Sequence, residues 1–136
     1  MKILEFRFAF HARDFDHSVR FYRDVLEMSY LGGWDRRDGK GALLSGGGNA
    51  VVEIYGAAEG EAYTGPEPVA INLALRLEDR AAVDSCCARL IALGESVEGP
   101  PQDRHWGHRS FIVLDPDRIP VHIYCEIHSL ETPLQE

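Results

Sequence analysis

The sequence has few cysteines and no long apolar run. These absences argue against a disulfide-rich secreted domain and against a membrane-spanning helix. Its three cysteines are Cys86, Cys87 and Cys125, an odd number with two adjacent, so no disulfide framework of a small secreted domain is expected. We interpret them as buried thiols. No apolar run reaches the about 20 residues that a membrane-spanning helix needs. The N-terminus alternates around Glu5 and Arg7, unlike a signal peptide, so we expect a cytoplasmic protein.

Basic residues are also fewer than acidic ones. The 136 residues include 14 Lys and Arg against 22 Asp and Glu, a formal net charge of −8. Such a chain repels phosphate backbones and anionic lipids, so we predict neither a nucleic acid nor a membrane partner. The same charge favours cationic ligands or simply serves solubility. Hydrophobic residues make up 45%, and with this length they predict one folded domain.

The first strand and helix are marked by an apolar face and an acidic cap. Residues 4–12 alternate as a strand, with one face formed by Phe6, Phe8 and Phe10. Asp14 or Asp16 is placed to cap a helix that we expect to reach about Glu27. An apolar stripe along this helix can cover the phenylalanine face.

Glycines divide the rest of the first half into short strands. We expect strands near residues 29–34, 41–45 and 49–55, separated by glycines. The segment 57–68 is rich in glycine and proline and has no periodicity, so it is predicted to be a linker. The first half is therefore expected to run strand, helix, strand, strand, strand.

The second half begins with the same two elements. Residues 69–77 alternate as a strand, and Arg80 to Leu93 has the period of a helix that ends at Gly94. We expect the inward positions of this helix to be Val83, Cys86 or Cys87, Leu90 and Leu93. The elements of the first half are thus repeated from here.

A hairpin closes the second half. A short strand is expected at Ser96 and Val97, followed by a polar loop over residues 99–108. Strands at 109–114 and 121–127 flank an Asp-Pro-Asp turn. Since the order of elements repeats, the sequence predicts two modules related by a pseudo-twofold axis, with Arg7 matched to Asn72.

Two motifs resemble a known superfamily. Residues 8–28, FAFHARDFDHSVRFYRDVLEM, and residues 106–117, WGHRSFIVLDPD, are similar to the opening and the final hairpin of vicinal oxygen chelate proteins, which include glyoxalases, bleomycin resistance proteins and dioxygenases. The resemblance implies an α+β fold of two βαβββ modules, each a curled mixed sheet that forms half of a cleft. It places one domain at residues 1–128, with modules at about 3–56 and 69–127, and a tail at 129–136. It also implies a homodimer.

The resemblance further implies where a metal is held in metal-dependent members. The four corresponding positions here are Arg7, Glu53, Asn72 and His122. Only Glu53 and His122 are good ligands for a divalent ion, and a guanidinium has no lone pair to donate. We therefore expect no bound metal. We expect Arg7 to form an ion pair with Glu53, because either charge alone in a partly dry cleft would be costly.

Other candidate ligand-binding residues lie on the strands and on the loop between residues 100 and 110. Trp34 and Trp106 offer aromatic faces for planar or cationic ligands, and either could instead lie at a rim or dimer contact. The pair His105 and His108 has metal-compatible spacing but lacks further partners. The remaining candidates are cleft-facing or loop positions: His11, Tyr55, Asn72, His108, Arg109 and Tyr124.

Two functions fit this pattern. The first is a metal-free protein that holds a small organic molecule in the sheet cleft. The alternative is an enzyme, a lyase, isomerase or dioxygenase, that uses Glu53 and His122 with Zn, Ni, Fe or Mn, or uses one of them as a general base. A third hypothesis is a dimeric domain whose cleft is unused. Because fold does not fix function, the family resemblance leaves these open.

Overall fold

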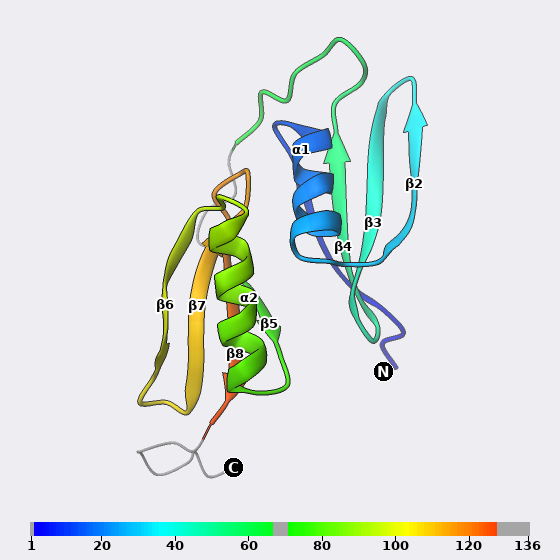
Figure 1. The fold of residues 1–136 in the computed structure, drawn as a ribbon. Helices are drawn as coiled ribbons and strands as arrows, with labels where there is room; N and C mark the ends of the chain where they lie inside the picture. Colours follow the sequence, from blue (N-terminus) through cyan, green and yellow to red (C-terminus); the bar gives the residue numbers. More distant parts are fainter. Residues whose placement is uncertain (1, 67–70, 128–136) are drawn as a thin grey trace. The chain divides into compact units, whose positions relative to one another are not determined.

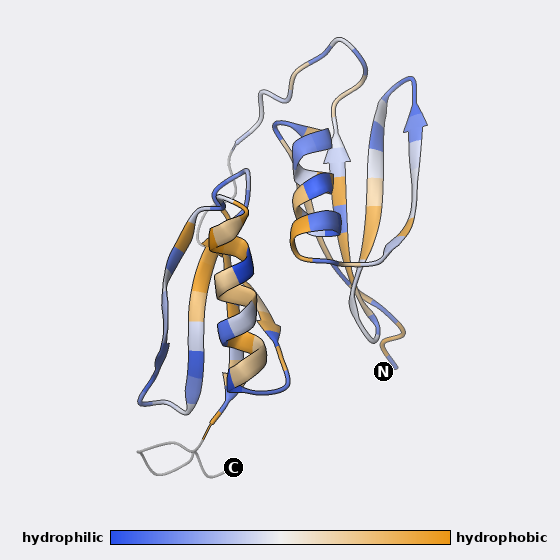
Figure 2. Ribbon diagram, viewed as in Figure 1, coloured by the Kyte–Doolittle hydropathy of each residue, from blue (hydrophilic) through white to orange (hydrophobic). Residues whose placement is uncertain are grey.

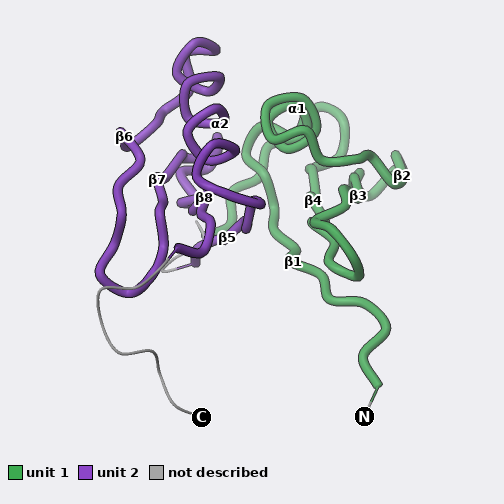
Figure 3. Tube along the Cα trace, turned by 60° about the horizontal axis from the view of Figure 1, so that its bottom comes forward, with its two compact units in different colours: residues 1–69 green, residues 70–136 purple. Residues whose placement is uncertain are grey.

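The computed structural model describes residues 2–66 and 71–127 and divides into two compact units (Figure 1). Unit 1 is Met1–Val69 and unit 2 is Ala70–Glu136 (Figure 3). Each unit holds one four-stranded sheet. The predicted α+β fold with two βαβββ modules is confirmed, whereas the cleft shared by the modules stays a prediction.

Unit 1 contains a mixed sheet with the strand order β1-β4-β3-β2. β1 is parallel to β4, and the other neighbours are antiparallel. Its elements follow the predicted order and begin or end within a few residues of the expected positions: β1 Phe6–His11, α1 Phe15–Arg20, the π-helical turn η1 Phe21–Val25, β2 Tyr30–Arg36, β3 Gly39–Gly47 and β4 Ala50–Gly56.

The helix of unit 1 begins at the predicted acidic cap. The Asp14 carboxylate accepts a hydrogen bond from the His17 amide at 3.1 Å. The helix covers one face of the sheet, and the core between them includes Phe10, Tyr22 and Ile54, each at most 7% exposed. Figure 2 shows the apolar residues gathered on the central strand β4. Burial of these side chains stabilises the unit by the hydrophobic effect.

Unit 2 repeats this topology with the order β5-β8-β7-β6. β5 is parallel to β8, and the remaining pairs are antiparallel. The bounds are β5 Leu73–Arg76, α2 Arg80–Ala92, β6 Val97–Asp103, β7 His108–Leu114 and β8 Pro120–Glu126. The repeat of elements read from the sequence is thus confirmed strand by strand.

The α2 helix matches its predicted ends and most of its predicted buried stripe. Asp79 caps its first turn by accepting from the Ala82 amide at 2.9 Å, and Gly94 follows with φ +79°. The predicted inward positions Val83, Cys87 and Leu90 are buried. Leu93 is 54% exposed, so its predicted burial is wrong. Leu93 is the C-cap residue, and the chain leaves the helical stripe there.

The predicted polar loop over residues 99–108 is also wrong. Strand β6 extends to Asp103, and only the turn from Arg104 to Gly107 separates it from β7. Pro100 and Pro101 argued against a strand, because proline cannot donate to a ladder. They are tolerated since β6 is an edge strand whose register with β7 shifts between Glu98 and Gln102.

Three remaining predictions concern the linker, the termini and the thiols. Residues 57–66 contain no helix or strand, as predicted for the linker. Linker residues 67 and 68, the first two residues of the predicted strand, Val69 and Ala70, and the tail at 129–136 lie outside the described residues. The thiols Cys87 and Cys125 are buried, and burial raises the pKa of Cys87.

Among the helices that the structure describes, none has the length and apolar character needed to cross a bilayer.

Candidate functional site

The face of the unit 1 sheet that points away from α1 carries a row of aromatic rings. Trp34 on β2 lies opposite Gly41 on β3, which lies opposite Tyr55 on β4, which in turn neighbours His11 on β1. Trp34 meets Tyr55 edge-on with ring centroids 6.0 Å apart, and His11 lies 5.2 Å from Tyr55. These three predicted residues come together from separate strands because they share one level of the pleated sheet.

Gly41 makes this arrangement possible. The Trp34 indole lies against the Gly41 backbone, where a Cβ atom would collide with the indole ring. The absence of a side chain therefore lets the indole lie close to the sheet and reach Tyr55. Sequence reasoning treated Gly41 only as a strand boundary.

Tyr63 extends the row from an unexpected place. It belongs to the predicted linker, yet its ring stacks on His11 with a centroid distance of 4.8 Å and an interplanar angle of 5°. The Tyr63 hydroxyl donates to the Pro66 carbonyl at 2.9 Å. No periodicity marks a residue in such a segment, so the sequence offered no signal for it. We call Trp34, Tyr55, His11 and Tyr63 the aromatic row.

The polar side chains beside the aromatic row are already paired. Arg7 Nη1 lies 3.4 Å from Glu53 Oε1, which confirms the predicted ion pair, and Arg7 also binds Glu5. The hydrogen bonds to Glu5 and Glu53 raise the pKa of Arg7. A hydrogen bond to Glu53, with partial burial, raises the pKa of the Tyr55 hydroxyl. Glu53 thus accepts from two sides while only 12% exposed.

This pairing does not fit a metal site. The carboxylate of Glu53 is engaged by a guanidinium and a phenol, and Arg7 repels a dication and offers no lone pair. Within residues 2–66 and 71–127, no group of three or more His, Cys, Asp or Glu side chains could hold a metal ion. The two family metal positions in unit 1 are therefore unsuited to one.

The corresponding face of unit 2 is more polar. Tyr124 on β8 stacks on His108 with centroids 4.3 Å apart, and it lies opposite Ser110 on β7. The Ser110 hydroxyl accepts from Arg104 Nε at 3.2 Å. These contacts give this face several hydrogen-bonding groups and one short aromatic stack.

Two further predicted positions in unit 2 occupy the same strands. His122 lies between Ala74 on β5 and Ile112 on β7, and it is half-buried. Asn72 lies just before β5 and is exposed. Asn72 is two residues before Ala74, which is the cross-strand neighbour of His122.

The structure separates two residues that the sequence had grouped in one ligand-binding loop. Arg109 projects to the helix side of the sheet, where its Nε and Nη1 atoms contact Asp84 at 2.8 Å and Asp103 at 3.0 Å. It therefore ties α2 to the strands. Trp106 lies in the β6–β7 turn, is 56% exposed and meets His105 edge-on. The grouping was wrong because β6 is longer than predicted.

Comparison with known structures agrees with this fold. A structure of SMU.1112c has a TM-score of 0.75 and 26% identity, and the match covers 91% of this chain and 98% of that one. TnmS3, an antibiotic binding protein from Streptomyces sp. CB03234, has a TM-score of 0.72 and 23% identity over 93% and 98%. A lactoylglutathione lyase from Agrobacterium tumefaciens has a TM-score of 0.65 and 21% identity over 88% and 91%.

The family assignment comes from the sequence match. None of the curated proteins compared with this chain matches it. Residues 7–123 match the model of the Glyoxalase/Bleomycin resistance protein/Dioxygenase superfamily. The matched segment runs from β1 of unit 1 to β8 of unit 2. With two βαβββ units and this match, the chain belongs to the glyoxalase/bleomycin resistance protein/dioxygenase superfamily.

Proposed function

We propose that the protein binds a planar, organic small molecule without a metal, and that the aromatic row of unit 1 provides the binding surface. The observation that carries the proposal is the line of rings Trp34, Tyr55, His11 and Tyr63 across one sheet face. Flat ligands gain dispersion and quadrupole interactions from such rings. The absence of a side chain at Gly41 lets the Trp34 indole lie against the sheet.

The charge around the row suggests which ligands are preferred. Ring faces attract cations, and the chain has a net charge of −8. Near the row, Arg7 is matched by both Glu5 and Glu53. Among ligands of equal size, we expect cationic ones to bind best and anionic ones least.

The pairing of Glu53 supports binding over catalysis. The Glu53 carboxylate is only 12% exposed and its Oε1 atom lies 3.4 Å from Arg7 Nη1, so the guanidinium competes with a substrate proton for this carboxylate. His122, the second predicted catalytic residue, has apolar neighbours on both adjacent strands, Ala74 and Ile112. The similarity to an antibiotic binding protein supports the same function, and the similarity to a lactoylglutathione lyase supports the enzyme alternative.

The quaternary structure and location belong to the same proposal. We expect a cytoplasmic homodimer, and Asn72, His108, Tyr124 and Trp106 stay candidate ligand-binding residues of unit 2. Sedimentation velocity checks the dimer, and a monomer at all concentrations would contradict it.

Tryptophan fluorescence titration in the presence of EDTA tests the proposal. The panel contains planar dyes of matched size that are cationic, neutral or anionic. Trp34→Ala should weaken binding about tenfold, the loss of one stacked ring. Trp34→Phe keeps a ring and should retain most of the affinity, while thermal unfolding checks that both variants are folded. Equal binding by wild type and Trp34→Ala would contradict the proposal, and binding only after metal addition would support the chelate enzyme.

A further inference from the structure

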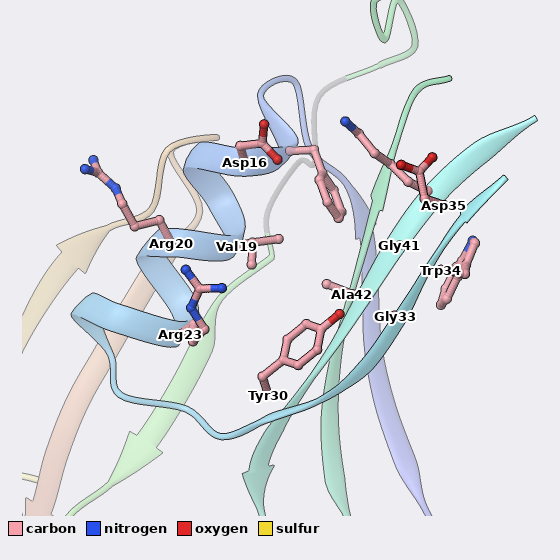
Figure 4. A pocket seen from close by; sticks show the side chains of 12 residues that line it. Asp16, Val19, Arg20, Arg23, Tyr30, Gly33, Trp34, Asp35, Gly41 and Ala42 are labelled. Carbon is pink, nitrogen blue, oxygen red and sulfur yellow. The ribbon is translucent and has the colours of Figure 1, made fainter. Parts of the chain in front are cut away.

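The helix-covered side of unit 1 contains a groove separate from the aromatic row. It has a volume of about 690 Å³ and lies between the helical segment α1–η1 and the strands β2 and β3 (Figure 4). All of its lining residues fall between residues 15 and 42, so it belongs to unit 1 alone. Figure 4 shows the Trp34 indole pointing away from the helix, which leaves the rings of the row on the other face.

Small residues and a short helix create the groove. The strand positions of its floor that face the helix are Gly33 and Ala42, which have no side chain and only a methyl group. The α-helical part of the helix is six residues long and packs mainly against β4. The edge strand β2 and its neighbour β3 therefore remain open on this side.

Apolar side chains line the inside of the groove. The Tyr30 hydroxyl lies directly over Gly33, where a Cβ atom would collide with it. In Figure 4, Val19 from α1 and Tyr30 from β2 point into the same space. Phe15 contributes a further ring. Three walls of this kind suit the face of one aromatic ring.

Cations outnumber carboxylates at the rim. The lining includes three basic residues, Arg20, Arg23 and Lys40, and two acidic ones, Asp16 and Asp35, in a chain with a net charge of −8. Arg23 binds Asp24 at 2.8 Å. Lys40 Nζ instead lies 5.1 Å from the Phe15 ring centroid, and in the described part of the chain no ion pair engages it.

We propose that this groove is a second small-molecule site, one that binds a single-ring aromatic carboxylate. The ring lies between Val19, Phe15 and Tyr30, and the carboxylate accepts hydrogen bonds from Lys40. A charge-assisted hydrogen bond is stronger than a neutral one. Asp35 lies opposite Lys40 on β2, but no ion pair joins Lys40 to it within the described residues. The groove takes an anion, whereas the aromatic row is expected to favour cations. The inference does not depend on the proposed function, because no ring of the row other than Trp34 lines the groove.

An NMR titration of the full chain tests this proposal. The probes are phenylacetate, 2-phenylethylamine and 2-phenylethanol, which share one ring and differ in charge. Phenylacetate should shift the amide signals of Gly33 and Ala42 and the methyl signals of Val19, and it should bind about tenfold more tightly than the amine. Equal affinity for the acid and the amine would overturn the proposal.

Matched variants separate this site from the aromatic row. Lys40→Gln should weaken phenylacetate binding about tenfold, whereas Arg37→Gln, which removes a charge from the neighbouring turn outside the groove, should leave it unchanged. Ala42→Leu should abolish binding by filling the floor. Tyr55→Leu should reduce dye binding to the row and spare phenylacetate.

Two results would refute the second site. One is phenylacetate binding that is insensitive to Lys40→Gln, a surface substitution that leaves the core intact. The other is loss of the wild-type phenylacetate signal on concentration of the protein, together with self-association that Ala42→Leu abolishes. That second pattern would identify a second copy of the chain as the occupant of the groove.

Discussion

The two units share one topology, but their helices hold their sheets differently. In unit 2, α2 has 13 residues and packs against β6, β7 and β8. Arg80 and Arg109 also connect it to Asp103 on β6, and Arg109 reaches Asp84 on the helix. In unit 1, the shorter α1 packs mainly on β4. The comparison shows that the outer strands remain open where no such ionic ties reach them.

The faces away from the helices differ as well. At the level of Tyr55, unit 1 has Gly41 and the overlying Trp34. At the matching level of Tyr124, unit 2 has Ser110, whose hydroxyl accepts from Arg104. In unit 1, the position beside Tyr55 has no side chain and the face is aromatic. In unit 2, the position beside Tyr124 has a hydroxyl and the face is polar.

The largest expected effect concerns the separate cores. Leu44 in unit 1 and Leu90 in unit 2 are fully buried. Leu44→Ala and Leu90→Ala should each lower the free energy of unfolding by about 2–5 kcal/mol, from lost apolar burial and a residual cavity. Because each unit has its own core, hydrogen exchange should accelerate mainly in the unit that carries the substitution. Equal acceleration across both units would show that they unfold as one.

The comparison of sheet faces is sharpened by Gly41→Ala and Ser110→Ala. The added methyl group at position 41 would displace the Trp34 indole, so planar dyes should bind about tenfold more weakly and the tryptophan emission should shift. Ser110→Ala removes only a hydrogen bond from the polar face and should change dye affinity far less. Fluorescence titration of both variants measures this, and equal losses would contradict the assignment of binding to unit 1.

The ionic ties of α2 should have a smaller effect. Arg109→Ala removes contacts to Asp84 and Asp103, and its side chain is 22% exposed, so it should lower the free energy of unfolding by about 1 kcal/mol. Arg76→Ala is the control, because its pair with Glu126 is 3.6 Å long and highly exposed. Urea unfolding compares them. Similar values for both would show that the ties do not hold α2.

The smallest expected effect is a change in the stability of unit 2 at acidic pH. Hydrogen bonds from Arg80 and Arg109 lower the pKa of Asp103 below its ordinary value of 3.8. A lowered folded-state pKa adds stability above the ordinary value, and this is lost as the pH falls through the folded-state pKa. Unit 2 should therefore lose stability only below about pH 4. Arg109→Ala should flatten this loss in acid unfolding curves, and an unchanged slope would exclude Asp103 as its source.

The sequence predicted the elements whose local signals agree with their packing. Asp14 caps its helix as expected, because an acidic side chain before an apolar stripe satisfies exposed amides. The pair of Arg7 and Glu53 was also foreseen from residue type and strand position. The β6 strand was predicted too short, because its prolines are acceptable only at a sheet edge, and edge position is a tertiary property.

The parts of the site that escaped prediction depend on contacts between distant segments. Tyr63 joins the aromatic row through a stack on His11 from a segment without periodicity. Gly41 matters because of what lies above it, the Trp34 indole. Arg109 reads as a loop residue until β6 brings Asp103 beside it. The spacing of residues in the local sequence predicts none of these three contacts.

The central claim is that an internal ion pair stands at the two unit 1 positions that the family resemblance implies for a metal. Metal analysis by mass spectrometry, on protein purified without chelators, tests it most directly. With Arg7 bound to Glu53, we expect Zn, Ni, Fe and Mn far below one ion per chain. A stoichiometric ion that is lost in Glu53→Gln would contradict the account.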